Sequence, residues 1–150
     1  LQSCHCAHII PALGQITLLR IILRQFYRSA VDQISPDAAF KQIEAEANRW
    51  DFGIGMGKPG KQEFAVWVEP HSASSLGEVK TILAKLDWLQ GKLDQPEFRQ
   101  LKALTDACAA QGHRRFHWMA TARVGIRPGS REANMLAARG MNPPSTRVVI

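Results

Sequence analysis

The feature that most constrains the fold is a pair of short apolar runs, residues 51–55 and 63–69, joined by a glycine-rich connection. Both runs are rich in residues that favour β-strands, and the connection has the composition of a hairpin turn. When two such strands pair antiparallel, the start of the first lies beside the end of the second. The sequence therefore predicts that Asp51 and Glu69 lie at the same edge of a sheet, close enough to share a divalent cation.

The second run is expected to be a central strand. Its apolar side chains fall on both faces, with Phe64, Val66 and Val68 on one and Ala65 and Trp67 on the other. Two apolar faces are typical of a strand that is covered on both sides. Pro70 has no backbone N–H for a strand ladder, so we expect the strand to end before it. Glu69 and His71 would then lie at a strand end.

Amphipathic helices are expected around this hairpin. Residues 13–27 carry apolar side chains at helical spacing, and arginines interrupt the apolar stretch, which argues against a membrane span. We expect this helix to dock on the domain's own core or on a second copy of the chain, which would make a homodimer. Binding to a membrane surface is the alternative. Residues 1–10 are expected to be loosely attached, because their cysteines and histidines lack the distant second pair of a zinc site.

A second helix is predicted to begin at Ser35, an N-cap residue ahead of Pro36, and to run into Trp50. Glu44 and Glu46 flank its apolar stripe on opposite sides, so either carboxylate can lean toward the sheet edge. The stripe itself would consist of Phe40, Ile43 and Ala47.

A longer helix is predicted over residues 76–93, where Ser75 and Glu78 have the spacing of a capping box. Lys85 falls on the border of its apolar face, so its ammonium group can reach either a carboxylate pair or water. The later elements are a helix over 96–110, one or two strands over 114–126, a helix from Ser130 to Gly140 and an edge strand over 147–150. This order predicts a single α+β domain over residues 1–150, a mixed α/β sandwich with helices flanking a mostly antiparallel or mixed sheet.

The net charge of +6 lies entirely in the last third of the chain. Residues 101–150 hold eight Lys and Arg against two Asp and Glu, whereas the first hundred residues sum to zero. An arginine-rich segment with few acids suits a polyanion, because Arg binds phosphate through two parallel hydrogen bonds. A solvated basic face without a partner is the alternative. The arginines expected to meet phosphates are Arg114, Arg115, Arg123 and Arg127.

Cysteine content bears on the compartment. Three cysteines give no disulfide framework, and their odd number favours a reducing environment. A cytoplasmic location is therefore expected.

A helix, a hairpin carrying Asp51 and then Glu69-x-His71, a helix with Lys85 and a further strand together resemble the PD-(D/E)xK nucleases. The resemblance covers roughly residues 36–126 and implies a restriction-endonuclease-like core. It also implies that Asp51 and Glu69 bind Mg²⁺, with Lys85 and His71 near the attacking water. Glu44 or Glu46 would correspond to the assisting glutamate of the first helix.

The chain departs from the pattern of this superfamily at three points. His71 stands where the motif has lysine, and Lys85 would replace that lysine from the following helix. Trp50 stands where a proline is common. Only two strands are predicted before the helix of Lys85, whereas the family has three.

Two other functions are compatible with the sequence. A metal-independent ribonuclease needs a base and an acid near the 2′-hydroxyl, which His71, His113 and His117 would supply. A basic domain without catalytic activity would instead bind nucleic acid or another protein.

Overall fold

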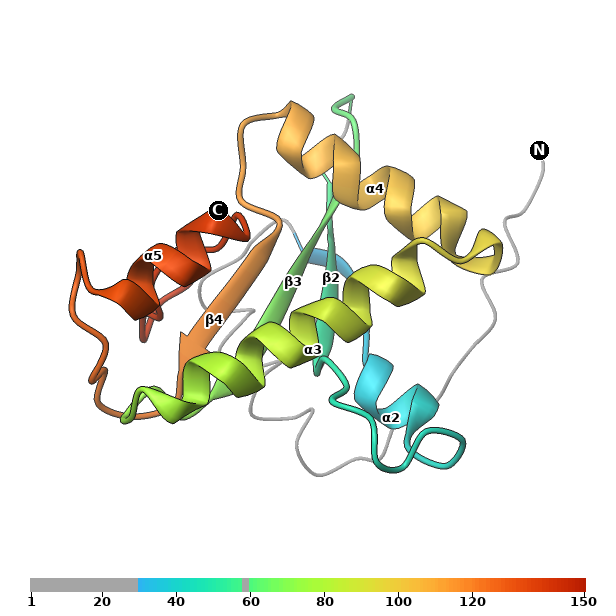
Figure 1. Cartoon of the computed structure of the whole chain (residues 1–150). Coiled ribbons are helices and arrows are strands. Elements are labelled where there is room, and N and C mark those ends of the chain that lie inside the picture. The colour runs from blue at the N-terminus through green and yellow to red at the C-terminus, as the bar shows by residue number, and fades with distance from the viewer. Residues whose placement is uncertain (1–29, 58–59) are drawn as a thin grey trace, which may run out of the picture.

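A computed structural model describes residues 30–57 and 60–150, and its centre is a four-stranded sheet (Figure 1). The strands lie in the order β1-β2-β3-β4. Neighbouring strands are antiparallel from β1 to β3, whereas β4 runs parallel to β3. Their bounds are β1 (Ala30–Ile34), β2 (Phe52–Met56), β3 (Phe64–His71) and β4 (Phe116–Ala120). A mixed sheet with flanking helices confirms the predicted α+β class.

The predicted hairpin is present as β2 and β3. Phe52 lies opposite Val68 and Met56 opposite Phe64, so the chain enters β2 beside the end of β3. Strand β1 was missed by the sequence prediction, although it pairs with β2 along its length. Its five residues include a central polar pair, Asp32 and Gln33, and this weakens the hydrophobic alternation that marks a strand. Three strands therefore precede the long helix α3 (Gly77–Leu93), not two.

The prediction that β3 ends before Pro70 is wrong. The strand continues to His71, with Pro70 opposite Met119 of β4. The backbone N–H of Trp67 points to β4, because it donates to the Arg115 carbonyl. Backbone N–H groups alternate in direction along a strand, so the position of Pro70 faces the side where β2 has already ended. No ladder hydrogen bond is lost there.

Helices α3, α4 (Arg99–Ala110) and α5 (Arg131–Ala138) confirm three of the predicted helices, and a 3₁₀ turn, η1 (Pro96–Phe98), precedes α4. Figure 1 shows α3 and α4 crossing in front of the sheet. The predicted capping box did not form, since α3 has no side-chain N-cap hydrogen bond. Ser130 does cap α5, accepting a hydrogen bond of 3.1 Å from the Ala133 N–H.

The core lies on both faces of the sheet. On one face, the aromatic side chains of β3 and β4 pack against α3 and α5; this cluster includes Trp67, Phe116, Trp118, Ile82, Leu86 and Leu136. On the other face, apolar side chains of β2 and β3 are buried, with Val148 and Ile150 packed against them; it includes Phe52, Ile54, Val66 and Val68. The alternation of side chains along β3 thus confirms the predicted central strand.

Helix α2 (Pro36–Phe40) is much shorter than predicted, although Ser35 caps it as expected. Ile43, expected in its buried stripe, is 74% exposed. The cause is Arg49, whose guanidinium donates to the Glu44, Ala45 and Ala47 carbonyls. Residues 41–47 form turns and bends beside this side chain, so those carbonyls do not serve a continuing helix.

The last part of the chain also differs from the prediction. Strand β4 covers only five residues of the predicted strand region 114–126. The edge strand predicted over 147–150 is wrong, since these residues form no strand; a parallel bridge joins Met119 of β4 to Ser145. Residues 1–10 and the predicted helix 13–27, with its homodimer, lie outside the described residues.

The part of the chain that the structure describes contains no helix long and apolar enough to cross a membrane.

Candidate functional site

The two strand-end carboxylates of the hairpin lie together, as the sequence predicts. Asp51 immediately precedes β2, and its backbone N–H donates to Glu69 Oε2 at 2.9 Å. Glu69 lies near the end of β3 and is fully buried, whereas the Asp51 side chain is 30% exposed. One carboxylate is thus held inside the protein, and the other opens the site to solvent.

Lys85 of α3 joins these two carboxylates. Its Nζ lies 3.2 Å from Asp51 Oδ1 and also contacts Glu69 Oε1. Lys85 lies on the border of the buried face of α3, so its long side chain can extend from the helix to the edge of the sheet. Two carboxylate oxygens, one from the residue before β2 and one from β3, therefore converge on one cationic atom. We call Asp51, Glu69 and Lys85 the acidic triad.

Burial dominates the electrostatics of the triad. It raises the pKa of Glu69 to about 8, with the Asp51 charge acting in the same direction and Lys85 against it. Burial also raises the pKa of Asp51, again opposed by Lys85. Burial alone would lower the pKa of Lys85, but the two carboxylates outweigh it and the pKa is raised. The triad therefore favours bound positive charge, whether protons or a cation.

His71 lies beside the triad and is oriented by Glu78 from the first turn of α3. His71 Nε2 is 2.8 Å from Glu78 Oε2, and His71 Nδ1 is 4.0 Å from Glu69 Oε1. A carboxylate accepts hydrogen bonds, so Nε2 carries the proton in this pair. In the neutral ring, Nδ1 on the triad side is then free to accept a proton.

Glu78 was not predicted as a site residue. Its position three residues after Ser75 pointed to a capping box, but its side chain turns to His71 instead. The sequence does contain a signal that could have identified Glu78: it lies seven residues before Lys85, and this spacing places both residues on the same face of a helix. The same rule links Lys85 to Lys92 one further pair of turns along α3.

The triad has oxygens that suit a hard divalent cation. Mg²⁺ commonly takes one or two protein carboxylates and completes its shell with water and substrate oxygens. Among residues 30–57 and 60–150, no three His, Cys, Asp or Glu side chains form a metal-binding group. A cation held by Asp51 and Glu69 would thus need solvent or substrate as further ligands, and the exposure of Asp51 leaves room for them.

The glutamates of the predicted second helix lie away from the triad. Glu44 Oε2 accepts from Trp88 Nε1 at 2.7 Å, and Glu44 Oε1 contacts Lys92. Lys92 Nζ lies 4.5 Å from the centre of the Phe40 ring. Glu46 is exposed. We call Glu44, Trp88, Lys92 and Phe40 the aromatic cluster, which fastens the segment after α2 to α3.

The four arginines expected to bind phosphate divide between two ends of the sheet. Arg114 and Arg115 precede β4, at the end where α4 leads into it (Figure 1). Arg123 and Arg127 follow β4, at the end where β3 finishes and α3 begins. Because β4 is parallel to β3, only the second pair lies at the end of the sheet that carries His71.

The three histidines of the ribonuclease hypothesis do not come together. His71 and His117 alternate onto opposite faces of the sheet, and His117 is only 7% exposed. Its Nε2 lies 2.8 Å from the Arg114 carbonyl, and burial lowers its pKa. His113 stacks on Phe64, with ring centres 5.2 Å apart, at the end of the sheet far from His71.

Comparison with known proteins found no match: no protein-family model matches this chain, and no curated protein or solved structure matches it significantly.

Proposed function

We propose that the protein hydrolyses phosphodiester bonds of nucleic acid with a divalent cation held by Asp51 and Glu69. The observation that carries this proposal is the convergence of Asp51 Oδ1 and Glu69 Oε1 on one cationic atom, Lys85 Nζ. Carboxylate oxygens that already surround a positive charge are suited to bind a metal ion near the place of the ammonium group. Three strands before α3 are also the number that the PD-(D/E)xK nucleases have at this place.

Each residue of the site would have a distinct part. Asp51 and Glu69 would hold Mg²⁺, which supplies Lewis-acid polarisation of a phosphoryl oxygen and a more acidic bound water. Lys85 would move its ammonium from the carboxylates toward the negative charge that develops on the phosphate. His71 Nδ1 would accept the proton of the attacking water, with Glu78 fixing the ring through Nε2.

Calorimetric titration with Mn²⁺ tests the site. We expect wild-type protein to bind the ion and Asp51→Asn/Glu69→Gln to lose binding, because the variant keeps the side-chain shapes but removes both carboxylates. Asp106→Asn/Glu97→Gln is the matched control, since it makes the same two amide substitutions at exposed positions on or beside α4. The same three proteins are then assayed for cleavage of DNA and RNA with and without Mg²⁺. Absence of binding in the presence of substrate would contradict the proposal.

The same contacts are also compatible with a second function, binding without catalysis. Lys85 already neutralises part of the charge of the two carboxylates, so the triad is also compatible with a structural ion cluster. The protein would then bind nucleic acid or a protein without cutting it. Metal-independent, salt-sensitive binding of nucleic acid without turnover would favour this function.

A further inference from the structure

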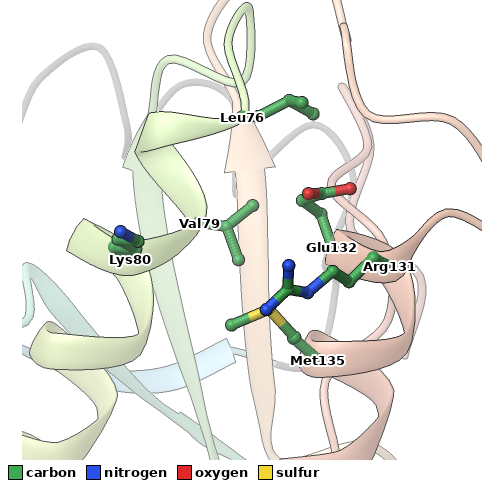
Figure 2. Close-up of a pocket in the computed structure, with 6 residues that line it drawn as sticks. All are labelled: Leu76, Val79, Lys80, Arg131, Glu132 and Met135. Carbon is green, nitrogen blue, oxygen red and sulfur yellow. The ribbon is translucent and has the colours of Figure 1, made fainter.

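A pocket lies between the first turns of α3 and α5 (Figure 2). Its volume is about 180 Å³, and it is open to solvent on one side. Figure 2 shows Arg131 extending from α5 toward α3, with Val79 and Met135 beside it. Six side chains line the pocket: Leu76, Val79, Lys80, Arg131, Glu132 and Met135. Two of them are cations and one is an acid, so the pocket carries a net positive charge.

The cations around this pocket are unpaired within the part of the chain that the structure describes. Lys80 and Arg131 are exposed, and neither makes a salt bridge to a described residue. The same holds for Arg123 and Arg127 in the loop that leads into α5. Three cations elsewhere on the surface are paired, in salt bridges between Lys102 and Asp94, Arg115 and Asp106, and Arg139 and Asp87. Other exposed cations without a salt bridge to a described residue are Lys41, Lys61, Arg99, Arg114 and Arg147, so the four cations at this end are distinguished by lying around one pocket and the loop beside it. We call Lys80, Arg123, Arg127 and Arg131 the basic end.

The basic end is fixed to the same end of the sheet as the acidic triad. The Thr121 N–H donates to the His71 carbonyl at 3.2 Å, and the Gly125 N–H donates to the Ala73 carbonyl at 2.7 Å. Gly125 leaves no room for a side chain, because a Cβ there would lie 2.4 Å from the Ser74 carbonyl oxygen. The loop of Arg123 and Arg127 is thus held against the segment that connects His71 to α3.

The first turn of α3 links the pocket to His71. Glu78 orients His71 on one side of the helix, while its sequence neighbours Val79 and Lys80 line the pocket on the other. The first turns of α3 and α5 also bring the partial positive charge of two helix N-termini to the pocket. The pocket and His71 therefore lie on two sides of the same helical turn.

We propose that the basic end binds the phosphate backbone of a nucleic acid, with one phosphate in the pocket between Lys80 and Arg131. The proposal deepens the function proposed above, since it identifies the surface that would present a phosphodiester to the acidic triad. Binding itself needs no metal. Arg127 and Arg123 contact the flanking phosphates, and the bidentate geometry of Arg suits them. Contacts of this kind are independent of base sequence.

The test compares two arginine pairs of equal charge at opposite ends of the sheet. Binding of a short fluorescent DNA duplex and of a single strand is measured by anisotropy in EDTA, over a series of salt concentrations. For Arg127→Gln/Arg131→Gln we expect affinity to fall about tenfold and the salt slope to decrease by about 2, one for each lost phosphate contact. For the control, Arg114→Gln/Arg115→Gln, we expect a change of less than about twofold.

A pair of lysines tests the pocket itself. Lys80→Gln is expected to weaken binding about threefold, whereas Lys102→Gln, whose lysine is paired with Asp94, leaves it unchanged. The changed residues are exposed except Arg115, which is partly buried, and circular dichroism checks the folding of all four variants. Equal losses in the two arginine pairs would overturn the proposal, since binding would then follow net charge alone. So would wild-type binding to phosphatidylserine vesicles in place of nucleic acid.

The outcome separates this proposal from the catalytic one. If the basic end binds nucleic acid and no cleavage occurs with any divalent metal, the surface stands and the hydrolytic function fails. If cleavage depends on Asp51 and Glu69 but the two double-arginine variants lose affinity equally, the catalytic proposal is supported and the proposed binding surface is wrong.

Discussion

Helix α3 holds two lysine–glutamate clusters that use similar side chains in different surroundings. In the acidic triad, Lys85 contacts a Glu69 side chain that is fully buried between the sheet and the helix. In the aromatic cluster, Lys92 contacts a Glu44 side chain that is 29% exposed and also accepts a hydrogen bond from Trp88. The two lysines are seven residues apart on the same face of the helix.

The pKa values of the two glutamates shift in opposite directions. Burial raises the pKa of Glu69 to about 8 despite its lysine. Hydrogen bonds from Lys92 and Trp88 lower the pKa of Glu44, because little burial opposes them. An ion pair therefore does not determine the charge state by itself; access to water does. The triad can therefore exchange protons or a metal ion, whereas the aromatic cluster keeps its charges and holds the segment after α2 against α3.

The largest expected effect comes from removing the two lysines separately. Lys85→Met should destabilise the protein by about 3–5 kcal/mol at about pH 9, because Glu69 then loses its cation and must either be buried as an unpaired charge or take up a proton when the chain folds. Lys92→Met should cost clearly less, since water reaches Glu44. Urea denaturation of both variants measures the difference. Equal losses would show that the two clusters do not differ in the way their burial indicates.

The pH dependence of stability should separate the glutamates. Below its ordinary pKa of 4.5, Glu69 is protonated in both the folded and unfolded states; between 4.5 and about 8 only the folded state holds this proton. The stability that this proton contributes is therefore lost as pH rises through about 8. In metal-free buffer we expect the free energy of unfolding to fall over this range, and Glu69→Gln to make the profile flatter.

Glu44→Gln is the matched control for that profile. The lowered pKa of Glu44 keeps it ionised in both states above its ordinary value, so this variant should retain the wild-type slope. A wild-type profile that is already as flat as that of Glu69→Gln would contradict the raised pKa of Glu69.

The smallest effect is expected for Trp88→Phe. This change removes the hydrogen bond to Glu44 but keeps an aromatic ring against Phe40, whose centre lies 5.5 Å from that of Trp88. Glu44 retains Lys92 and water as partners, so the denaturation midpoint should move only slightly. A loss as large as that of Lys85→Met would show that the aromatic cluster, too, is critical for folding.

The part of the site that follows from local rules was predicted correctly. A hairpin requires Asp51 and Glu69 to meet, and helical spacing places Lys85 at the edge of a buried face. Glu78 was missed because the sequence does not say which of two partners its carboxylate takes, the helix N-terminus or His71. A glutamate at position 78 is compatible with either hydrogen bond, so its presence does not distinguish them.

The parts that depend on long-range pairing were not predicted. Whether β4 runs parallel or antiparallel to β3 decides which arginines lie near His71, and local periodicity carries no information on that direction. The length of α2 depends on Arg49, which draws three carbonyls toward itself from outside the helix. Helical propensity alone favoured a longer element.

The separation of these elements along the chain has a consequence for the order of folding. The triad, His71 and Glu78 all lie within residues 51–85, so hairpin and helix can assemble them with short loop closures. The three arginines of the basic end join Lys80 only when Phe116 pairs with Trp67 in the parallel ladder, which closes a much longer loop. We expect the carboxylates and Lys85 to meet early and the phosphate-binding surface to arrive last. A chain still being synthesised would thus bring the triad together before it could hold a nucleic acid.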